Sequence, residues 1–136
     1  MQSKPQLFCY TYAGGNASFF DVIDGDLADI DVIKPEYAGH GARRKEPFSS
    51  DFAELADDMY AQLKERWNGE DYALFGYSMG SISLVEILKR IIDRREIRTP
   101  VCVFLAAHEP ISKNEYLRVP HDKLEEWAKQ RTIDFG

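Results

Sequence analysis

The fold of this 136-residue chain is decided by the stretch Tyr72-Ala73-Leu74-Phe75-Gly76-Tyr77-Ser78-Met79-Gly80. Its first half is short and apolar, as in a buried β-strand, and an apolar helix is predicted from Gly80 to Ile92. The pentapeptide between them matches the pattern Gly-x-Ser-x-Gly in the strand–turn–helix context of a nucleophile elbow. Such a sharp turn lifts the serine above the sheet, and glycines flank it because any side chain there would collide with neighbouring backbone. We therefore predict that Ser78 is presented rather than buried.

Outward from this turn, short apolar runs alternate with longer amphipathic segments, which is typical of βα units in a parallel sheet. Asp51 is the predicted N-cap of one helix, with Glu54 reaching back toward it. Glu36 to Pro47 is predicted to be an irregular loop. The predicted fold class is α/β, a mostly parallel sheet with helices on both faces. Strands are expected at Leu7–Thr11, Asp31–Lys34, Tyr72–Gly76 and Val101–Ala106, and helices at Ala17–Ile23, Asp51–Trp67, Gly80–Ile92 and Asp122–Gln130.

Composition excludes several classes of protein. The length suits one domain and not two. Seventeen Lys and Arg against 23 Asp and Glu give a net charge of −6, which argues against nucleic acid as a partner. Neither a signal peptide nor an apolar stretch long enough for a bilayer is evident, so we expect a cytoplasmic protein without membrane association. Cys9 and Cys102 each sit in an apolar run and are predicted to be reduced core residues. No Cys or His pair has zinc-ligand spacing, so neither metal nor cofactor is expected.

The chemistry expected at the elbow is acyl transfer. The amide of Met79 and the positive end of the following helix would stabilise negative charge on a carbonyl oxygen beside Ser78. A second donor should come from the loop after the first strand, where Ala13-Gly14-Gly15 has small side chains and Ala13 is the candidate. The alternatives are an ordinary tight turn around Ser78 and a plain Gly-Gly turn after the first strand.

Three segments, Tyr12 to Ala17, Glu36 to Arg43 and Phe75 to Gly80, resemble in order and spacing the type II thioesterases of the α/β-hydrolase superfamily. The resemblance implies an α/β-hydrolase core over residues 1–110, incomplete at its C-terminus. It also implies that residues 111–136 begin the lid over the acyl channel, around Leu124 and Trp127.

The same resemblance implies a function. Type II thioesterases are stand-alone editing partners of non-ribosomal peptide and polyketide synthases. They hydrolyse acyl thioesters on the phosphopantetheine arm of acyl or peptidyl carrier proteins. By this resemblance Ser78 is the nucleophile that becomes acylated, and the amides of Ala13 and Met79 form the oxyanion hole.

The chain departs from the family pattern in two ways. Four positions carry unusual residues, none of which removes a catalytic atom: Thr11 and Ala38 for proline, His40 for arginine and Tyr77 for histidine. In addition, the family's catalytic aspartate and histidine follow later strands, and this sequence ends before either. We therefore expect this chain alone to be inactive, and expect a longer polypeptide or another chain to cover the open sheet edge.

Residues within the chain offer only weak substitutes for the missing base and acid. His108 and Glu109 follow the fourth predicted strand, where Glu109 could orient a histidine, although a solvated loop carboxylate is the commoner interpretation. His40 and His121 are predicted to be surface or loop-packing histidines.

Other interpretations stay open at this point. The cationic run Arg43, Arg44 and Lys45 could contact an acidic carrier protein or could simply be solvated. The elbow also suits another serine acyl hydrolase or an acyltransferase, since fold and nucleophile do not fix the acceptor. A non-catalytic carrier-protein-binding module that lacks the base is the alternative outside enzymes.

Overall fold

The computed structural model describes residues 3–107. The helix expected at Asp122–Gln130 and the lid expected at 111–136 lie outside these residues. The described elements, in chain order, are β1 (Gln6–Tyr10), η1 (Ala17–Ile23), β2 (Asp31–Ile33), η2 (Gly41–Arg43), α1 (Phe52–Arg66), β3 (Tyr72–Tyr77), α2 (Met79–Arg94) and β4 (Cys102–Ala106).

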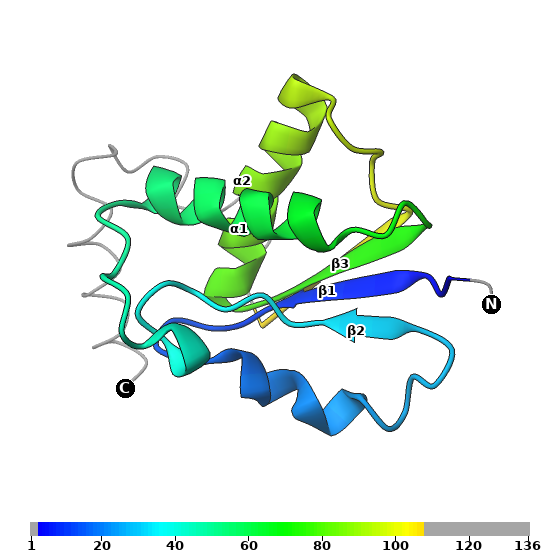
Figure 1. Cartoon of the computed structure of the whole chain (residues 1–136), viewed down its shortest axis with the longest axis horizontal. Helices are drawn as coiled ribbons and strands as arrows, with labels where there is room; N and C mark the ends of the chain where they lie inside the picture. The colour runs from blue at the N-terminus through cyan, green and yellow to red at the C-terminus, as the bar shows by residue number, and fades with distance from the viewer. Residues whose placement is uncertain (1–2, 108–136) are drawn as a thin grey trace.

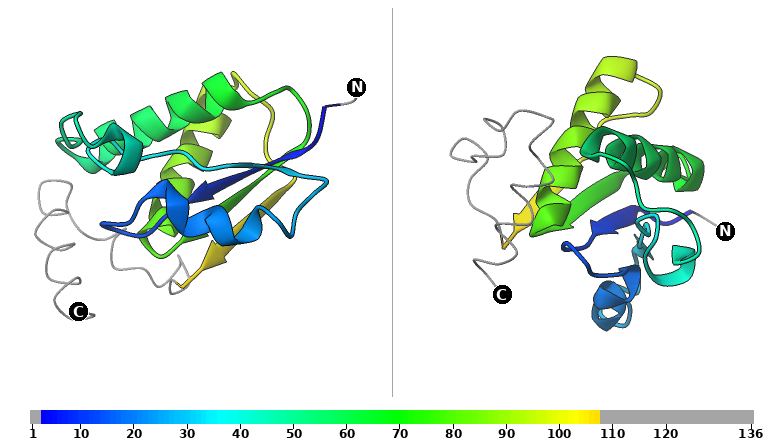
Figure 2. Two further views of the ribbon diagram at one scale, coloured as in Figure 1. Left: turned by 60° about the horizontal axis from the view of Figure 1, so that its bottom comes forward. Right: turned by 90° about the vertical axis from the view of Figure 1, so that its left-hand side faces the viewer.

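The four strands form one parallel sheet in the order β2-β1-β3-β4. The helices α1 and α2 cover one face, and the 3₁₀ helix η1 lies on the other (Figures 1 and 2). All four strands were expected, with bounds that differ by at most one residue at either end. The predicted α/β class, with a parallel sheet between helical layers, is confirmed.

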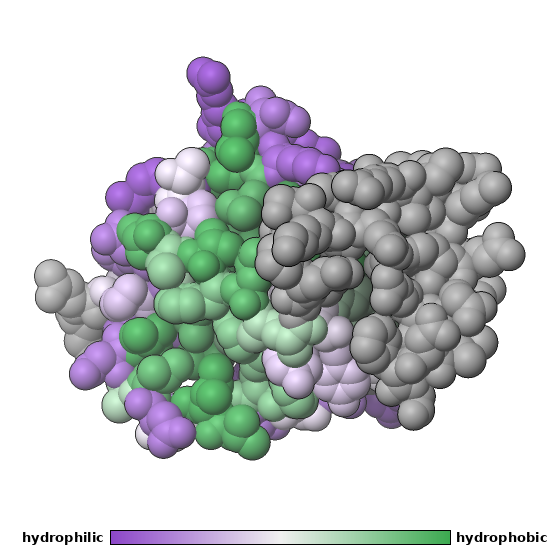
Figure 3. Space-filling model, turned by 180° about the vertical axis from the view of Figure 1, so that it is seen from behind, coloured by the Kyte–Doolittle hydropathy of each residue, from purple (hydrophilic) through white to green (hydrophobic). Residues whose placement is uncertain are grey.

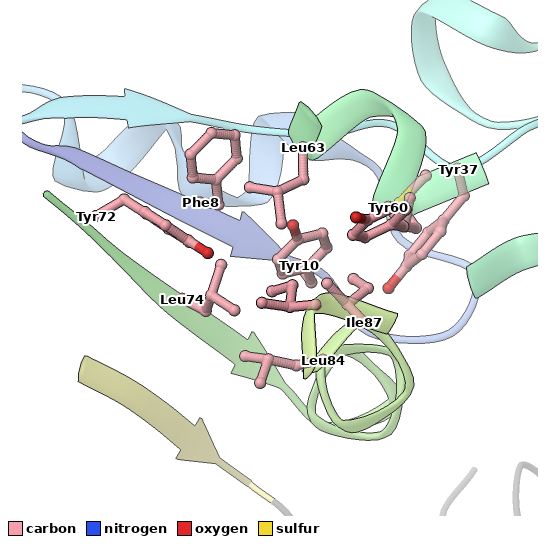
Figure 4. Packing of buried hydrophobic residues seen from close by; sticks show 11 residues of the cluster. Phe8, Tyr10, Tyr37, Tyr60, Leu63, Tyr72, Leu74, Leu84 and Ile87 are labelled. Atoms are coloured by element: carbon pink, nitrogen blue, oxygen red, sulfur yellow. The ribbon is translucent and has the colours of Figure 1, made fainter. Parts of the chain in front are cut away.

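The main core lies between the sheet and the two α-helices. Alternate residues of β1 and β3 point into it, so Phe8, Tyr10 and Leu74 pack against Leu63 of α1 and Leu84 of α2, all fully buried (Figure 4). Burial of each such side chain stabilises the fold by about 1.5 to 3 kcal/mol. This packing fixes the start of α2 against the ends of β1 and β3, where the elbow lies.

The N-terminus of α1 differs in one detail from the predicted capping box. Asp51 caps the helix as expected, with its Oδ1 accepting from the Glu54 amide at 2.8 Å. The Glu54 carboxylate, however, reaches back to Ser50, whose hydroxyl donates to it at 2.6 Å. The Ser50 amide donates to the same carboxylate, so Ser50 offers two donors where the Asp51 amide would offer one.

The two cysteines have different environments. Cys9 is buried on the η1 face of β1, as predicted, and this burial raises the pKa of its thiol to about 12. Cys102 is exposed, so its prediction as a core residue is wrong. It lies on β4, the outermost strand of the described sheet, where Phe104 is also 51% exposed. Seen from behind, on the side of β4, the described part of the molecule shows a broad apolar surface (Figure 3).

Candidate active site

Ser78 is the single residue between the end of β3 and the start of α2. Its backbone has φ 55° and ψ −118°, a conformation that residues with a Cβ rarely adopt. The side chain is half-buried and makes no capping hydrogen bond to α2. The Ser78 amide donates to the Ala106 carbonyl at 2.8 Å, which ties the turn to the end of β4. The predicted presentation of Ser78 on a sharp, strained turn therefore agrees with the structure.

The flanking glycines are required by the close approach of backbone, as the sequence suggested. A Cβ on Gly76 would lie 2.5 Å from the carbonyl oxygen of Gly80 and 2.7 Å from Cα of Ser81. A Cβ on Gly80 would overlap the carbonyl oxygen of Tyr10, at the end of β1. Strand, turn and helix can pack this closely only because both positions lack a side chain.

The strain at Ser78 gives a stability prediction. Glycine removes the penalty of a Cβ at φ 55°, so we expect Ser78→Gly to be more stable than Ser78→Ala by about 1 kcal/mol. Urea unfolding of the two variants measures this difference. As a contrast, Ala61→Gly in the exposed interior of α1 should lose about 1 kcal/mol. An alanine variant at position 78 that equals or exceeds the glycine variant would show that the turn is unstrained.

The two predicted oxyanion donors follow the carboxyl ends of β1 and β3, which are neighbours in the parallel sheet. Met79 is the first residue of α2, so its amide belongs to the first turn, where the helix dipole is positive. Ala13 lies in a turn closed by the Gly15 amide, which donates to the Tyr12 carbonyl at 3.1 Å, with Gly14 at φ 77°. Within residues 3–107, neither the Ala13 amide nor the Met79 amide donates to an acceptor. Both amides are thus available in this part of the molecule.

An aromatic cluster beside Ser78 was missed from the sequence. The ring of Tyr77 lies 5.0 Å from that of Phe19 and 6.3 Å from that of Tyr12, measured between centroids. Phe19 and Tyr12 also contact each other edge to face at 5.1 Å and are both more than a third exposed. These three rings form an apolar wall that begins at Tyr77, the residue directly before the serine. The available signal was the presence of aromatic residues both after the first strand, at Tyr12 and Phe19, and directly before Ser78, at Tyr77.

His40 is a loop-packing histidine, as predicted. Its Nδ1 is 3.0 Å from the Ala38 carbonyl oxygen, and its ring packs edge to face against Tyr37 and Phe48. It is the single histidine in the described part of the chain, and no hydrogen bond joins it to Ser78. His108, Glu109 and His121 lie outside the described residues.

The cationic run divides into two kinds of residue. Arg44 and Lys45 are exposed. Arg43 is not a free docking charge, because its guanidinium pairs with Asp58 at 2.5 Å and with Glu46 at 2.7 Å. These hydrogen bonds, first to Glu46 and then to Asp58, raise the pKa of Arg43 above its ordinary value. The charge of Arg43 is thus largely balanced by carboxylates of this chain, whereas Arg44 and Lys45 present theirs to solvent.

Residues 3–107 contain no group of three or more His, Cys, Asp or Glu side chains arranged to hold a metal ion. Among the helices of that same part, none is both long enough and apolar enough to cross a bilayer.

A parallel sheet of this order, with a serine on the strained turn from strand to helix, defines an α/β-hydrolase fold. The family model described as "Thioesterase domain" matches residues 5–134. The chain therefore belongs to the thioesterase family, which confirms the resemblance found in the sequence.

Individual relatives support the assignment. The medium-chain S-acyl fatty acid synthase thioesterase of Homo sapiens is 25% identical over 134 residues, which is 96% of this chain and 50% of that protein. The structure of the type II thioesterase BorB, from the borrelidin biosynthetic cluster, is similar with TM-score 0.74 and 29% identity, over 98% of this chain and 55% of BorB. The structure of RedJ, a thioesterase from the prodiginine pathway of Streptomyces coelicolor, is similar with TM-score 0.71 and 25% identity. The match covers 96% of this chain and 53% of RedJ. The chain spans about half the length of the curated relatives it matches.

Proposed function

We propose that the protein hydrolyses acyl thioesters carried on the phosphopantetheine arm of acyl or peptidyl carrier proteins of non-ribosomal peptide or polyketide synthases. The observation that carries this proposal is the strained Ser78 at the N-terminus of α2, with the available amide of Met79 next to it in the chain and that of Ala13 in the loop after β1. The similarity to BorB and RedJ supports the choice of substrate class.

The chemistry proceeds in two steps through Ser78. Its Oγ attacks the thioester carbonyl carbon and gives its proton to a general base, while the amides of Ala13 and Met79 bind the developing oxyanion. The C–S bond then breaks, and the pantetheine sulfur leaves as a thiol after taking up that proton. In the second step water attacks the acyl-Ser78 ester, which releases the free acid and restores the hydroxyl.

The general base is proposed to be a histidine from outside residues 3–107. His40 is unsuited to this role because its ring is held by the Ala38 carbonyl and by two aromatic rings. The family pattern places the base after the nucleophile in the chain order serine, acid, histidine.

The aromatic wall of Tyr12, Phe19 and Tyr77 suits this substrate class. Its partly exposed rings border the serine and can pack against the apolar part of an acyl chain or of the pantetheine arm. The chain has a net charge of −6, so it would be repelled overall by an acidic carrier protein. Contact with such a carrier would therefore depend on local cations such as Arg44 and Lys45.

The test is hydrolysis of an acyl-loaded carrier protein by the full-length protein, followed by intact mass of the carrier. We expect loss of the acyl mass and release of free acid, with His40→Gln as active as the wild type. Transfer of the acyl group to an added acceptor in place of water would indicate an acyltransferase. Stable binding of the carrier without any loss of acyl mass would contradict the proposal and favour a binding module.

A further inference from the structure

We propose that Tyr37 is a positioning residue for this reaction, whose hydroxyl holds the loop after β1 and the first turn of α2 at the spacing that one oxyanion needs. The inference rests on the proposed function, because it assigns the amides of Ala13 and Met79 to the oxyanion hole. It is carried by a hydrogen-bonded bridge through a residue that belongs to neither segment.

The bridge connects three parts of the chain. Tyr37, in the loop between β2 and η2, is 2% exposed, and its ring extends from that loop toward α2 (Figure 4). Its hydroxyl lies 3.0 Å from the carbonyl oxygen of Thr11, two residues before Ala13. The same hydroxyl lies 3.2 Å from Oγ of Ser83, which in turn is 3.3 Å from the carbonyl oxygen of Met79. The Tyr37 hydroxyl therefore joins the loop that carries Ala13 to Ser83, which lies one helical turn after Met79 on α2.

The direction of the hydrogen bonds follows from the chemistry of the groups. A carbonyl oxygen only accepts, so the Tyr37 hydroxyl donates its one proton to Thr11, and the Ser83 hydroxyl then donates to Tyr37. With its proton used in this way, the Ser83 side chain does not also bond the Met79 carbonyl, and Ser83 is tied to Met79 through the backbone of α2. Burial raises the pKa of Tyr37 well above its ordinary value, so the phenol keeps its proton. The bridge from Thr11 through Tyr37 to Ser83 is thus uncharged at neutral pH.

The segment that carries Tyr37 is itself anchored. The Glu36 carboxylate accepts from the Ala17 amide, the first of η1, at 3.0 Å. The Glu36 carbonyl accepts from Nη1 of Arg43 at 2.8 Å and from Nε2 of Gln62, on α1, at 3.0 Å. Tyr37 therefore projects from a support fixed to both helical layers, which makes its hydroxyl a defined reference point.

Such positioning acts on the transition state. The oxyanion exists only during the reaction, so a small shift of one donor amide weakens binding of the transition state and leaves binding of the thioester unchanged. Loss of the bridge should accordingly lower kcat and leave KM nearly constant.

The test compares Tyr37→Phe and Ser83→Ala in the full-length protein, with an acyl thioester of pantetheine as substrate. We expect each variant to lose about tenfold in kcat, with KM within about twofold of the wild type. The double variant should lose no more than the worse single variant, because both changes break one bridge.

Tyr60→Phe is the matched control. Tyr60 is 1% exposed and its hydroxyl donates to Glu96 at 2.8 Å, so this change also removes a hydrogen-bonded phenol. Neither Tyr60 nor Glu96 touches the elbow, and we expect wild-type kcat and KM.

The outcomes separate this inference from the proposed function. Wild-type kcat in Tyr37→Phe and Ser83→Ala, or losses that multiply in the double variant, would overturn the positioning role. If Tyr37→Phe does not fold, Ser83→Ala decides alone by the same kcat and KM criteria. An unreactive wild type would reject the proposed function, and the inference would fall with it.

Discussion

Ser78→Ala should abolish thioester hydrolysis while leaving the fold intact. The change deletes the hydroxyl that is proposed to form the acyl intermediate, and nucleophile removal in serine hydrolases costs about 10⁴-fold or more in kcat. The hydroxyl makes no capping hydrogen bond, so the backbone of the turn loses no support. Steady-state kinetics on an acyl-loaded carrier, together with circular dichroism, measure both parts of the prediction.

Ser49→Ala provides the comparison for this change. Ser49 lies in the loop before α1, outside the elbow, and should retain full activity. Turnover by Ser78→Ala at more than a few per cent of the wild-type rate would remove Ser78 from the nucleophile position, whatever the state of the fold.

Gly80→Ala should unfold or strongly destabilise the protein. The added methyl group would overlap the Tyr10 carbonyl oxygen and lie 3.0 Å from that of Thr11. Both neighbours are backbone at the end of a central strand, so neither can move aside as a side chain would. We expect the free energy of unfolding to fall by about 3 kcal/mol, at the upper end of the range for overpacked sites, with activity lost in parallel.

Gly25→Ala is the matched glycine substitution. No atom lies within 4 Å of the position that its Cβ would occupy, so its stability should stay within about 0.5 kcal/mol of the wild type. Equal stability of Gly80→Ala and Gly25→Ala in urea unfolding would show that β1 and α2 do not approach as closely as described.

The sequence was most informative where local rules decide the structure. A short apolar run, two glycines around a serine and a following helix predicted both the turn and its neighbours, because strand, turn and helix signals are all short-range. The cap at Asp51 followed from the same kind of rule. Such signals were enough to predict the sheet, the elbow and the family.

Long-range contacts could not be predicted in this way. Whether Cys102 is buried depends on which elements cover β4. The apolar run around Cys102 would read the same in a covered strand and in an uncovered one, so the sequence could not predict that Cys102 is exposed. Arg43 belongs to a cationic run, yet its partner Asp58 is 15 residues away on α1. The bridge through Tyr37 likewise joins residues 26 and 46 positions apart, which no periodicity or motif connects.

Acylation of Ser78 can be observed by intact-mass spectrometry with peptide mapping. The full-length protein would be treated with a fluorophosphonate and, separately, quenched during turnover of an acyl-loaded carrier. We expect one adduct in each case, located on Ser78 and absent from Ser78→Ala. A folded protein that acquires no adduct, or carries it on another residue such as Ser81, would show that Ser78 is not the nucleophile.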